Sequence, residues 1–186
     1  MSEPRIEPLT EPSVVEPLLD GYLRWCIERM TATNGVHFDD PDEVVAQYQR
    51  SFRDELPNLL SPRGRLLVAR IGEDAVGVGA LKPVDAVTSE IKRMYVDPST
   101  RGRGIGRALL RRLLADAREE GFRLARLETA NYMVEAHALY RSLGFRDSAV
   151  FDHAETAMSE GIERFMYFME LPLVPPRRLI QNSPSR

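Results

Sequence analysis

The sequence predicts one α/β domain in which helices cover the faces of a mixed central β-sheet. Strand-like and helix-like segments follow each other in the order β-α-α-β-β-β-α-β-α-β-β, without an internal repeat or a linker. The 186 residues suffice for one hydrophobic core, and 43% hydrophobic with 28% charged residues is typical of soluble globular proteins. We therefore expect residues 1–172 to form the domain and residues 173–186 to be a mobile tail.

The first half of the chain predicts a strand, two helices and a hairpin. Residues 5–9 are typical of a short strand, and apolar residues at helical spacing predict a helix over 10–30. Asp40 followed by Pro41 marks the start of a second helix, because Asp caps helix N-termini and Pro fits the first turn. Loops are expected at 31–40 and 57–64, and hairpin strands at 65–71 and 75–82 around Gly72-Glu73-Asp74.

The second half predicts strands that alternate with helices. A strand over 90–96 precedes a glycine-rich turn and a helix over 105–120, which Gly121 ends because glycine is favoured just past a helix C-terminus. Gly144 ends a later helix in the same way. The remaining segments are a strand at 124–129, a helix at 134–143, a strand at 145–150, a loop at 151–161 and a last strand at 162–171.

The glycine-rich turn is the strongest functional signal in the sequence. Gly102, Gly104 and Gly106 alternate directly before the helix at 105–120. Such a loop lets backbone N–H groups point at one spot, and the helix N-terminus adds its positive end. The turn therefore predicts an anion site suited to a phosphate or pyrophosphate. The arginines at the loop, Arg101, Arg103 and Arg107, are either a phosphate clamp or part of a solvated helix face.

Two common phosphate-binding loops do not match this turn. A P-loop requires a lysine and a hydroxyl residue after its last glycine, whereas Arg107 and Ala108 follow Gly106. A dinucleotide-binding fingerprint requires a third glycine at a spacing that falls on Arg107 or Leu109, and it belongs after a first strand. The chemistry of nucleotide hydrolysis and of dinucleotide binding is therefore excluded.

Two motifs lie on either side of the strand at 124–129. The first is Arg101-Gly-Arg-Gly-Ile-Gly106, and the second is Ala136-His-Ala-Leu-Tyr140-Arg-Ser-Leu-Gly144-Phe145. They are similar to two signatures of the GNAT superfamily of acyl-CoA-dependent N-acyltransferases, Arg/Gln-x-x-Gly-x-Gly/Ala and Ala-x-x-Leu-Tyr-x-x-x-Gly-Phe. The resemblance covers residues 65–144 well, and the flanking helices and strands match only in layout.

The resemblance implies a GNAT-like sheet that is splayed between its fourth and fifth strands, 90–96 and 124–129, and acetyl-CoA as the donor. In the family the loop amides hold the CoA pyrophosphate, and the pantetheine arm pairs with the preceding strand like an added β-strand. Many members also place an asparagine where this chain has Met133, and Asn131 either compensates or is a turn residue. The residues so implied in donor binding are Met94, Tyr95, Val96, Arg101, Gly102, Arg103, Gly104, Ile105, Gly106, Arg107 and Asn131.

The family's reaction also implies two catalytic residues. An amine with a pKa near about 10 is mostly charged at neutral pH, so a base helps to deprotonate it. Glu90 occupies the position of a general-base glutamate in several members, and its alternative role is a salt bridge with Lys92 or Arg93. Tyr140 occupies the position of the tyrosine that returns a proton to the CoA sulfur, and its alternative role is core packing.

Composition excludes several other functions. A net charge of −3 with mixed charges argues against a nucleic-acid partner, and no apolar run suits a membrane span or a signal peptide. The lone Cys26 is expected to be a buried thiol, which is consistent with a cytoplasmic location. His37, His137 and His153 are too scattered for a metal site, so no metal is expected.

The sequence therefore predicts an N-acetyltransferase that moves the acetyl group of acetyl-CoA to a primary amine of a small or amino-acid-like acceptor. A protein N-terminus or lysine is the alternative acceptor, and a non-catalytic acyl-CoA sensor is the alternative outside the enzymes. Because a sensor needs neither Glu90 nor Tyr140, their presence favours an enzyme. A homodimer is expected only because dimers are common in the family.

Overall fold

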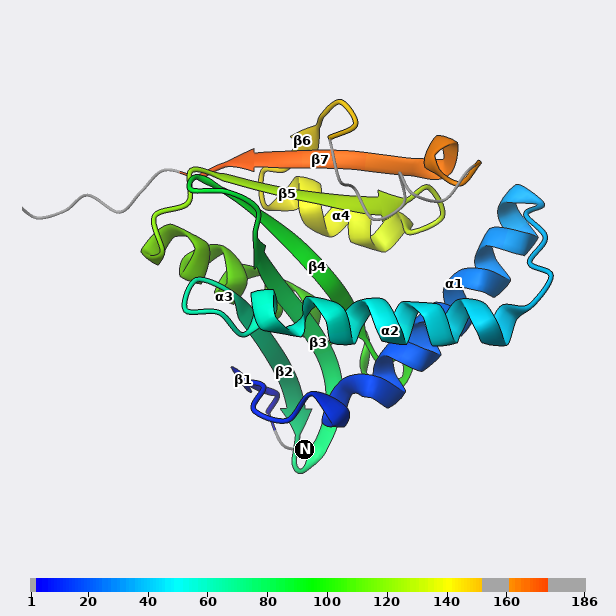
Figure 1. Cartoon of the computed structure of the whole chain (residues 1–186). Coiled ribbons are helices and arrows are strands. Elements are labelled where there is room, and N and C mark those ends of the chain that lie inside the picture. The colour runs from blue at the N-terminus through cyan, green and yellow to red at the C-terminus, as the bar shows by residue number, and fades with distance from the viewer. Residues whose placement is uncertain (1–2, 152–160, 174–186) are drawn as a thin grey trace, which may run out of the picture.

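The computed structural model describes residues 3–151 and 161–173, which form one mixed seven-stranded sheet in the order β1-β2-β3-β4-β5-β7-β6. Helices α1 and α2 cover one face, and α3 and α4 cover the other (Figure 1). The predicted α/β fold class is thereby confirmed. The strands are β1 Arg5–Pro8, β2 Arg65–Ile71, β3 Asp74–Pro83, β4 Thr88–Val96, β5 Leu124–Ala130, β6 Arg146–Asp147 and β7 Met166–Pro172. The helices are α1 Glu16–Asn34, α2 Pro41–Leu59, α3 Ile105–Glu119 and α4 Val134–Ser142.

Alternation along the central strands divides the hydrophobic core into two layers. In β2, Leu66 and Val68 pack with α1 and α2, whereas Leu67 and Ala69 pack with α3. This is the period of two that places successive side chains on opposite faces of a sheet. Both faces are buried in the centre of the sheet, and this explains why β2 and β3 are apolar almost throughout.

The helix boundaries differ from prediction by about one turn. Helix α1 begins later than expected, after a 3-10 turn over Pro12–Val15, and it continues to Asn34. The apolar pattern ends at Met30, but only Gly35, with φ 67°, stops the helix by adopting the left-handed conformation. Asp40 caps α2 as predicted, since its side chain accepts a hydrogen bond from the Glu43 N–H at 3.0 Å.

The C-terminal strands are shorter than the sequence indicates. The strand expected at 145–150 reduces to Arg146–Asp147, and the last strand starts at Met166 after a 3-10 turn over Glu163–Phe165. Leu173, where the mobile tail was expected to begin, is buried, and its N–H donates to Arg123 O at 2.7 Å. The rest of the expected tail and most of the expected loop at 151–161, with His153, lie outside the described residues.

Strands β4 and β5 separate partway along their length. They are parallel neighbours over only three pairs, which end at Glu90↔Arg126, although β4 continues to Val96 and β5 to Ala130. Figure 1 shows the two strands meeting at one end and diverging toward the other. The predicted splay between the fourth and fifth strands is therefore present, and it opens directly beside Glu90.

The described helices do not include one that is both long and apolar enough to cross a membrane.

Candidate active site

The glycine-rich turn links the end of β4 to the start of α3. Gly102 and Gly104 have φ values of 78° and 76°, and Gly104 is the N-cap of α3. A Cβ added at either glycine would meet no atom within 4 Å, so backbone conformation and not space explains the glycines there. Gly106 differs, because its φ is not positive and an added Cβ would contact Leu139 and Val96 at ordinary distances. No side chain of the described residues caps the start of α3, so its first amides have no side-chain acceptor there, as an anion site requires.

The three loop arginines have different surroundings. The Arg101 Nε–H donates to Val96 O at 3.2 Å, and its guanidinium lies 5.5 Å from the Trp25 ring centroid and 5.9 Å from that of Tyr95. Arg107 reaches α4, where Nη2 donates to Ser142 Oγ at 2.9 Å. Arg103 is exposed at the tip of the turn. The loop is thus attached to α1 by Arg101 and to α4 by Arg107.

The proposed donor strand lies beyond the β4–β5 pairing. Val96 is opposite Gly77 of β3 and Tyr95 is opposite Val78, so this end of β4 is held from one side. On the side of β4 that faces β5, the last paired residue is Glu90. Met94 and Val96 pack with the α3 core layer, whereas Tyr95 packs with α1 and α2. The backbone of this segment is therefore positioned by β3 and directed into the splay.

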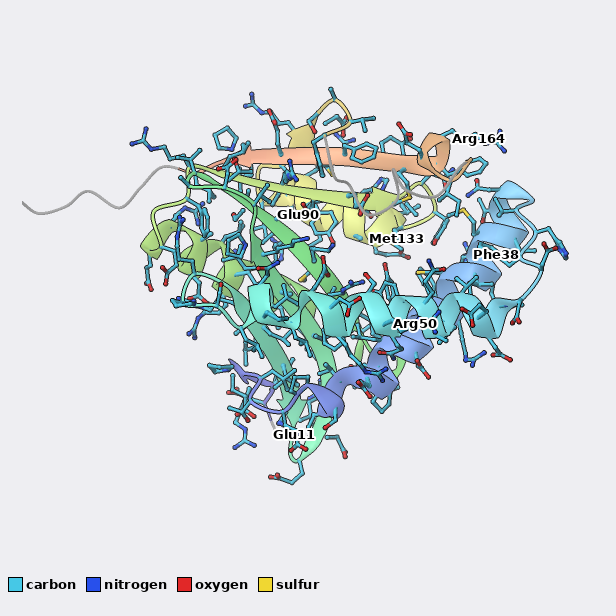
Figure 2. The ribbon with its side chains drawn as sticks, viewed as in Figure 1. Glu11, Phe38, Arg50, Glu90, Met133 and Arg164 are labelled. Atoms are coloured by element: carbon cyan, nitrogen blue, oxygen red, sulfur yellow. The ribbon has the colours of Figure 1, made fainter. Side chains whose placement is uncertain are left out.

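Glu90 is buried where the splay begins. Its side chain is 3% exposed, and Oε2 accepts hydrogen bonds from both Nε and Nη2 of Arg126 at 3.2 Å. The Lys92 ammonium lies 3.8 Å from Oε1. The ion pair with Lys92 considered from the sequence is present, and Arg126 is an additional partner from β5. Glu90 faces the side of the sheet that α2 covers (Figure 2).

Tyr140 is buried on the other side of the sheet. It belongs to the core layer of α3 and α4, where its ring centroid lies 5.9 Å from that of Phe145. Burial raises the pKa of the Tyr140 hydroxyl to about 12, because the ionised form loses its hydration. The hydroxyl is therefore protonated throughout the neutral range. Glu90 and Tyr140 thus lie on opposite faces of the sheet.

Asn131 is engaged by the end of α1. Its side-chain amide and that of Asn34 exchange hydrogen bonds in both directions, each at 3.0 Å. Met133 accepts a contact from Thr129 Oγ1 at 3.5 Å through its sulfur. The pair of amides joins the end of β5 to the end of α1, a structural task that suits a turn residue.

Cys26 is buried, as the sequence predicts, and His37 and His137 have separate polar neighbours. Burial raises the pKa of the Cys26 thiol to about 11, against the hydrogen bonds from Tyr132 and Tyr22, so the thiol is neutral. His37 is exposed beside Asp39, and His137 Nε2 lies 3.0 Å from Ala130 O. Within residues 3–151 and 161–173, no three His, Cys, Asp or Glu side chains are arranged to hold a metal ion.

Sequence reasoning missed two charged residues near the splay. Glu55 of α2 accepts hydrogen bonds from Lys82, Lys92 and Arg93, and Arg126 of β5 pairs with Glu90. Glu55 follows Phe52 by three residues, and this spacing puts it on the helix face that packs on the sheet. A glutamate on an apolar helix face could have indicated a buried ion pair at Glu55. Nothing in the sequence of β5 indicates a role for Arg126.

Comparison with known proteins identifies the family. The model of the acetyltransferase (GNAT) family matches residues 24–145. The chain belongs to the GNAT acetyltransferase family. The predicted family and the assignment to the acyltransferases are thereby confirmed.

One relative and two solved structures illustrate what the chain is similar to. An IAA acetyltransferase of Azospirillum brasilense is 39% identical over 120 residues, which cover 64% of this chain and 74% of the relative. A GNAT family acetyltransferase from Staphylococcus aureus Mu50 shares the fold with a TM-score of 0.68 and 20% identity, over 92% of this chain and 99% of that one. Another, from Elizabethkingia anophelis with acetyl-CoA bound, has a TM-score of 0.57 and 20% identity, over 93% and 100%.

Proposed function

We propose that this protein is an N-acetyltransferase that moves the acetyl group of acetyl-CoA to a primary amine of a small or amino-acid-like acceptor. The observation that carries the proposal is the position of the β4–β5 splay. Pairing of the two strands ends at Glu90, and the glycine-rich turn follows at the far end of β4. The order of a buried carboxylate, a strand end without a β5 partner and an anion-binding turn along β4 supports an acetyl-CoA site with Glu90 as the base.

The donor half of the site suits acetyl-CoA. The amides at the start of α3, with the left-handed Gly102 and Gly104 before them, would hold the pyrophosphate. The backbone of Met94, Tyr95 and Val96 would pair with the pantetheine arm, each hydrogen bond contributing about 1 kcal/mol net. The Elizabethkingia structure has acetyl-CoA bound, and we expect the same acyl donor here.

The reaction we propose is direct attack in a ternary complex. The acceptor nitrogen attacks the thioester carbonyl carbon, a C–N bond forms, and the C–S bond breaks. Glu90 takes the proton of the amine, directly or through water, and Tyr140 donates to the departing thiolate from the opposite face. A backbone N–H near Tyr95 or Val96 would stabilise the oxyanion, because a fixed donor acts on charge that develops in the transition state.

A small acceptor is favoured by the burial of Glu90. Its carboxylate is 3% exposed, beneath α2 and between Lys92 and Arg126. A small amine can reach such a group, whereas a protein substrate must insert an extended segment. A cytoplasmic location and a homodimer stay predictions from the sequence.

A thiol-release assay tests this function. The protein is incubated with acetyl-CoA and a panel of amines, amino acids and peptides, and CoA release is measured with Glu90→Gln and Tyr140→Phe as variants. We expect release with a small amine and a loss of about 10²-fold in kcat with each variant. Release only with peptides would favour a protein acceptor. CoA binding without release by any acceptor would favour the sensor, and unchanged kcat in both variants would contradict the catalytic assignment.

A further inference from the structure

A carboxylate on α2, Glu55, bridges cations from two neighbouring strands. Its Oε1 accepts hydrogen bonds from Lys82 Nζ at 2.8 Å and from Lys92 Nζ at 2.7 Å. Its Oε2 accepts one from Arg93 Nη2 at 2.7 Å. The side chains of Lys92 and Arg93 are only 6% and 1% exposed, so this carboxylate neutralises charges that water does not reach. We call these four residues the Glu55 cluster.

Lys92 and Arg93 are consecutive in β4, yet both contact the same helix. In a regular strand, successive side chains point to opposite faces of the sheet. A β-bulge makes the exception possible, because β3 advances from Val78 to Ala80 while β4 advances from Tyr95 to Lys92, one residue more. Arg93 adopts φ 57°, and no other described residue except glycine has a positive φ. The strained residue of the bulge is therefore the one that Glu55 holds.

The Arg93 side chain is also fixed by aromatic rings of α2. Its guanidinium carbon lies 4.2 Å from the centroid of Tyr48 and 5.9 Å from that of Phe52. For a residue with a side chain, the left-handed conformation costs about 1–2 kcal/mol. Stacking on Tyr48 and the hydrogen bond to Glu55 stabilise Arg93 in this conformation. Helix α2 thus stabilises a backbone shape in β4 that the strand alone does not favour.

The bulge lies between the two functional parts of β4. Glu90, where pairing with β5 ends, precedes it, and the donor segment Met94–Val96 follows it directly. Regular pairing with β3 resumes only at Tyr95↔Val78, after the bulge. A change in the bulge would therefore rotate or shift Met94–Val96.

We propose that Glu55 is a positioning residue for the donor site: by holding Lys92 and Arg93, it fixes the bulge and hence the backbone of Met94–Val96. This inference rests on the proposed function, which assigns that backbone to acetyl-CoA. Burial raises the pKa of Glu55, but Lys92 and Arg93 outweigh burial and lower it to about 2. The carboxylate is therefore ionised at any pH at which the enzyme is assayed, and its effect on the donor site is independent of pH there.

Calorimetric titration with CoA tests the inference on the full chain. Glu55→Gln keeps the size of the side chain and removes its charge. We expect the Kd for CoA and the KM for acetyl-CoA to rise about tenfold, the effect of losing one or two backbone hydrogen bonds. Because Glu55 does not touch the reacting atoms, kcat at saturating acetyl-CoA should fall much less than KM rises, and the pH profile of kcat should keep its shape. Glu55→Asp, which keeps the charge, should recover part of the affinity.

A control variant separates positioning from a general loss of stability. Glu120→Gln breaks a part-buried ion pair with Arg65 of β2 on the α3 face of the sheet, opposite the face that Glu55 covers. It should leave the Kd for CoA unchanged. CoA affinity equal to wild type in Glu55→Gln overturns the inference, and so does an equal loss in both variants. Wild-type protein that binds no CoA would instead overturn the proposed function.

A second pair of variants serves if Glu55→Gln does not fold. Lys82→Met and Lys92→Met each remove one ammonium from Glu55 Oε1, at nearly equal distances, but only Lys92 adjoins the bulge. We expect weaker CoA binding in Lys92→Met alone. Equal CoA affinity in the two variants overturns the inference.

Discussion

The glycine-rich turn and the Glu55 cluster lie at opposite ends of the donor segment Met94–Val96, and they are built in opposite ways. The turn consists of consecutive, mostly exposed residues whose shape comes from the left-handed Gly102 and Gly104. The cluster combines buried and half-buried side chains from α2, β3 and β4, and its shape comes from packing and ion pairs. The turn should therefore affect ligand binding with little effect on stability, whereas the cluster should affect both.

The largest expected effect comes from the turn. Replacing both Gly102 and Gly104 with alanine forces two side chains into a left-handed conformation at about 1–2 kcal/mol each, so the loop should change shape. We expect CoA affinity to fall about 100-fold, with a Tm within a few degrees of wild type. Calorimetric titration and thermal unfolding measure the two quantities. A large drop in Tm would mean that the turn, like the cluster, supports the fold.

The next effect concerns the acid stability of the cluster. The pKa of Glu55 is about 2 in the folded protein and about 4.5 in the unfolded chain, so the ionised carboxylate stabilises the fold above pH 4.5. This contribution should be lost as the pH falls from about 4.5 toward 2, and solvent screening reduces it to about 2 kcal/mol. Urea unfolding of wild type and Glu55→Gln at several pH values measures it.

The difference in unfolding free energy between the two proteins should shrink as the pH falls through this window. A difference that stays constant from pH 6 to pH 3 would show that Glu55 does not gain its stability from its charge.

A smaller effect is expected at Gly79, which faces the bulge from β3. An added Cβ would lie 2.7 Å from the Met94 sulfur and 3.1 Å from Leu113 Cδ1. Gly79→Ala should therefore displace Met94, lowering the unfolding free energy by about 1–2 kcal/mol and weakening CoA binding together. Gly72→Ala is not a suitable control, because Gly72 has a positive φ. Ala75→Gly, in the same strand and away from the bulge, should lower stability without changing CoA affinity.

The smallest effect is expected at Arg107. Its hydrogen bond to Ser142 is exposed and should contribute less than about 0.5 kcal/mol to stability. If the guanidinium also contacts a phosphate, Arg107→Ala should weaken CoA binding about threefold, more at low salt than at high salt. Titrations at two salt concentrations measure this. An affinity that is equal to wild type at both concentrations would place Arg107 on the solvated helix face.

Much of the fold was predictable because its signals are local. The order of strands and helices, the Asp40 cap and the glycine after α3 follow from residues close in sequence. The errors occurred where tertiary packing decides an element's length. Helix α1 runs past its last apolar residue until Gly35 stops it, and β6 keeps only two residues beside β7.

The candidate site divides in the same way. The sequence by itself determined the glycine-rich turn, because the left-handed glycines and the start of α3 depend on consecutive residues. Only the tertiary structure decided that Glu90 pairs with Arg126 and that Glu55 holds the bulge beside it. These contacts join residues more than thirty positions apart, and ion pairs of this kind form only after the helices have packed on the sheet.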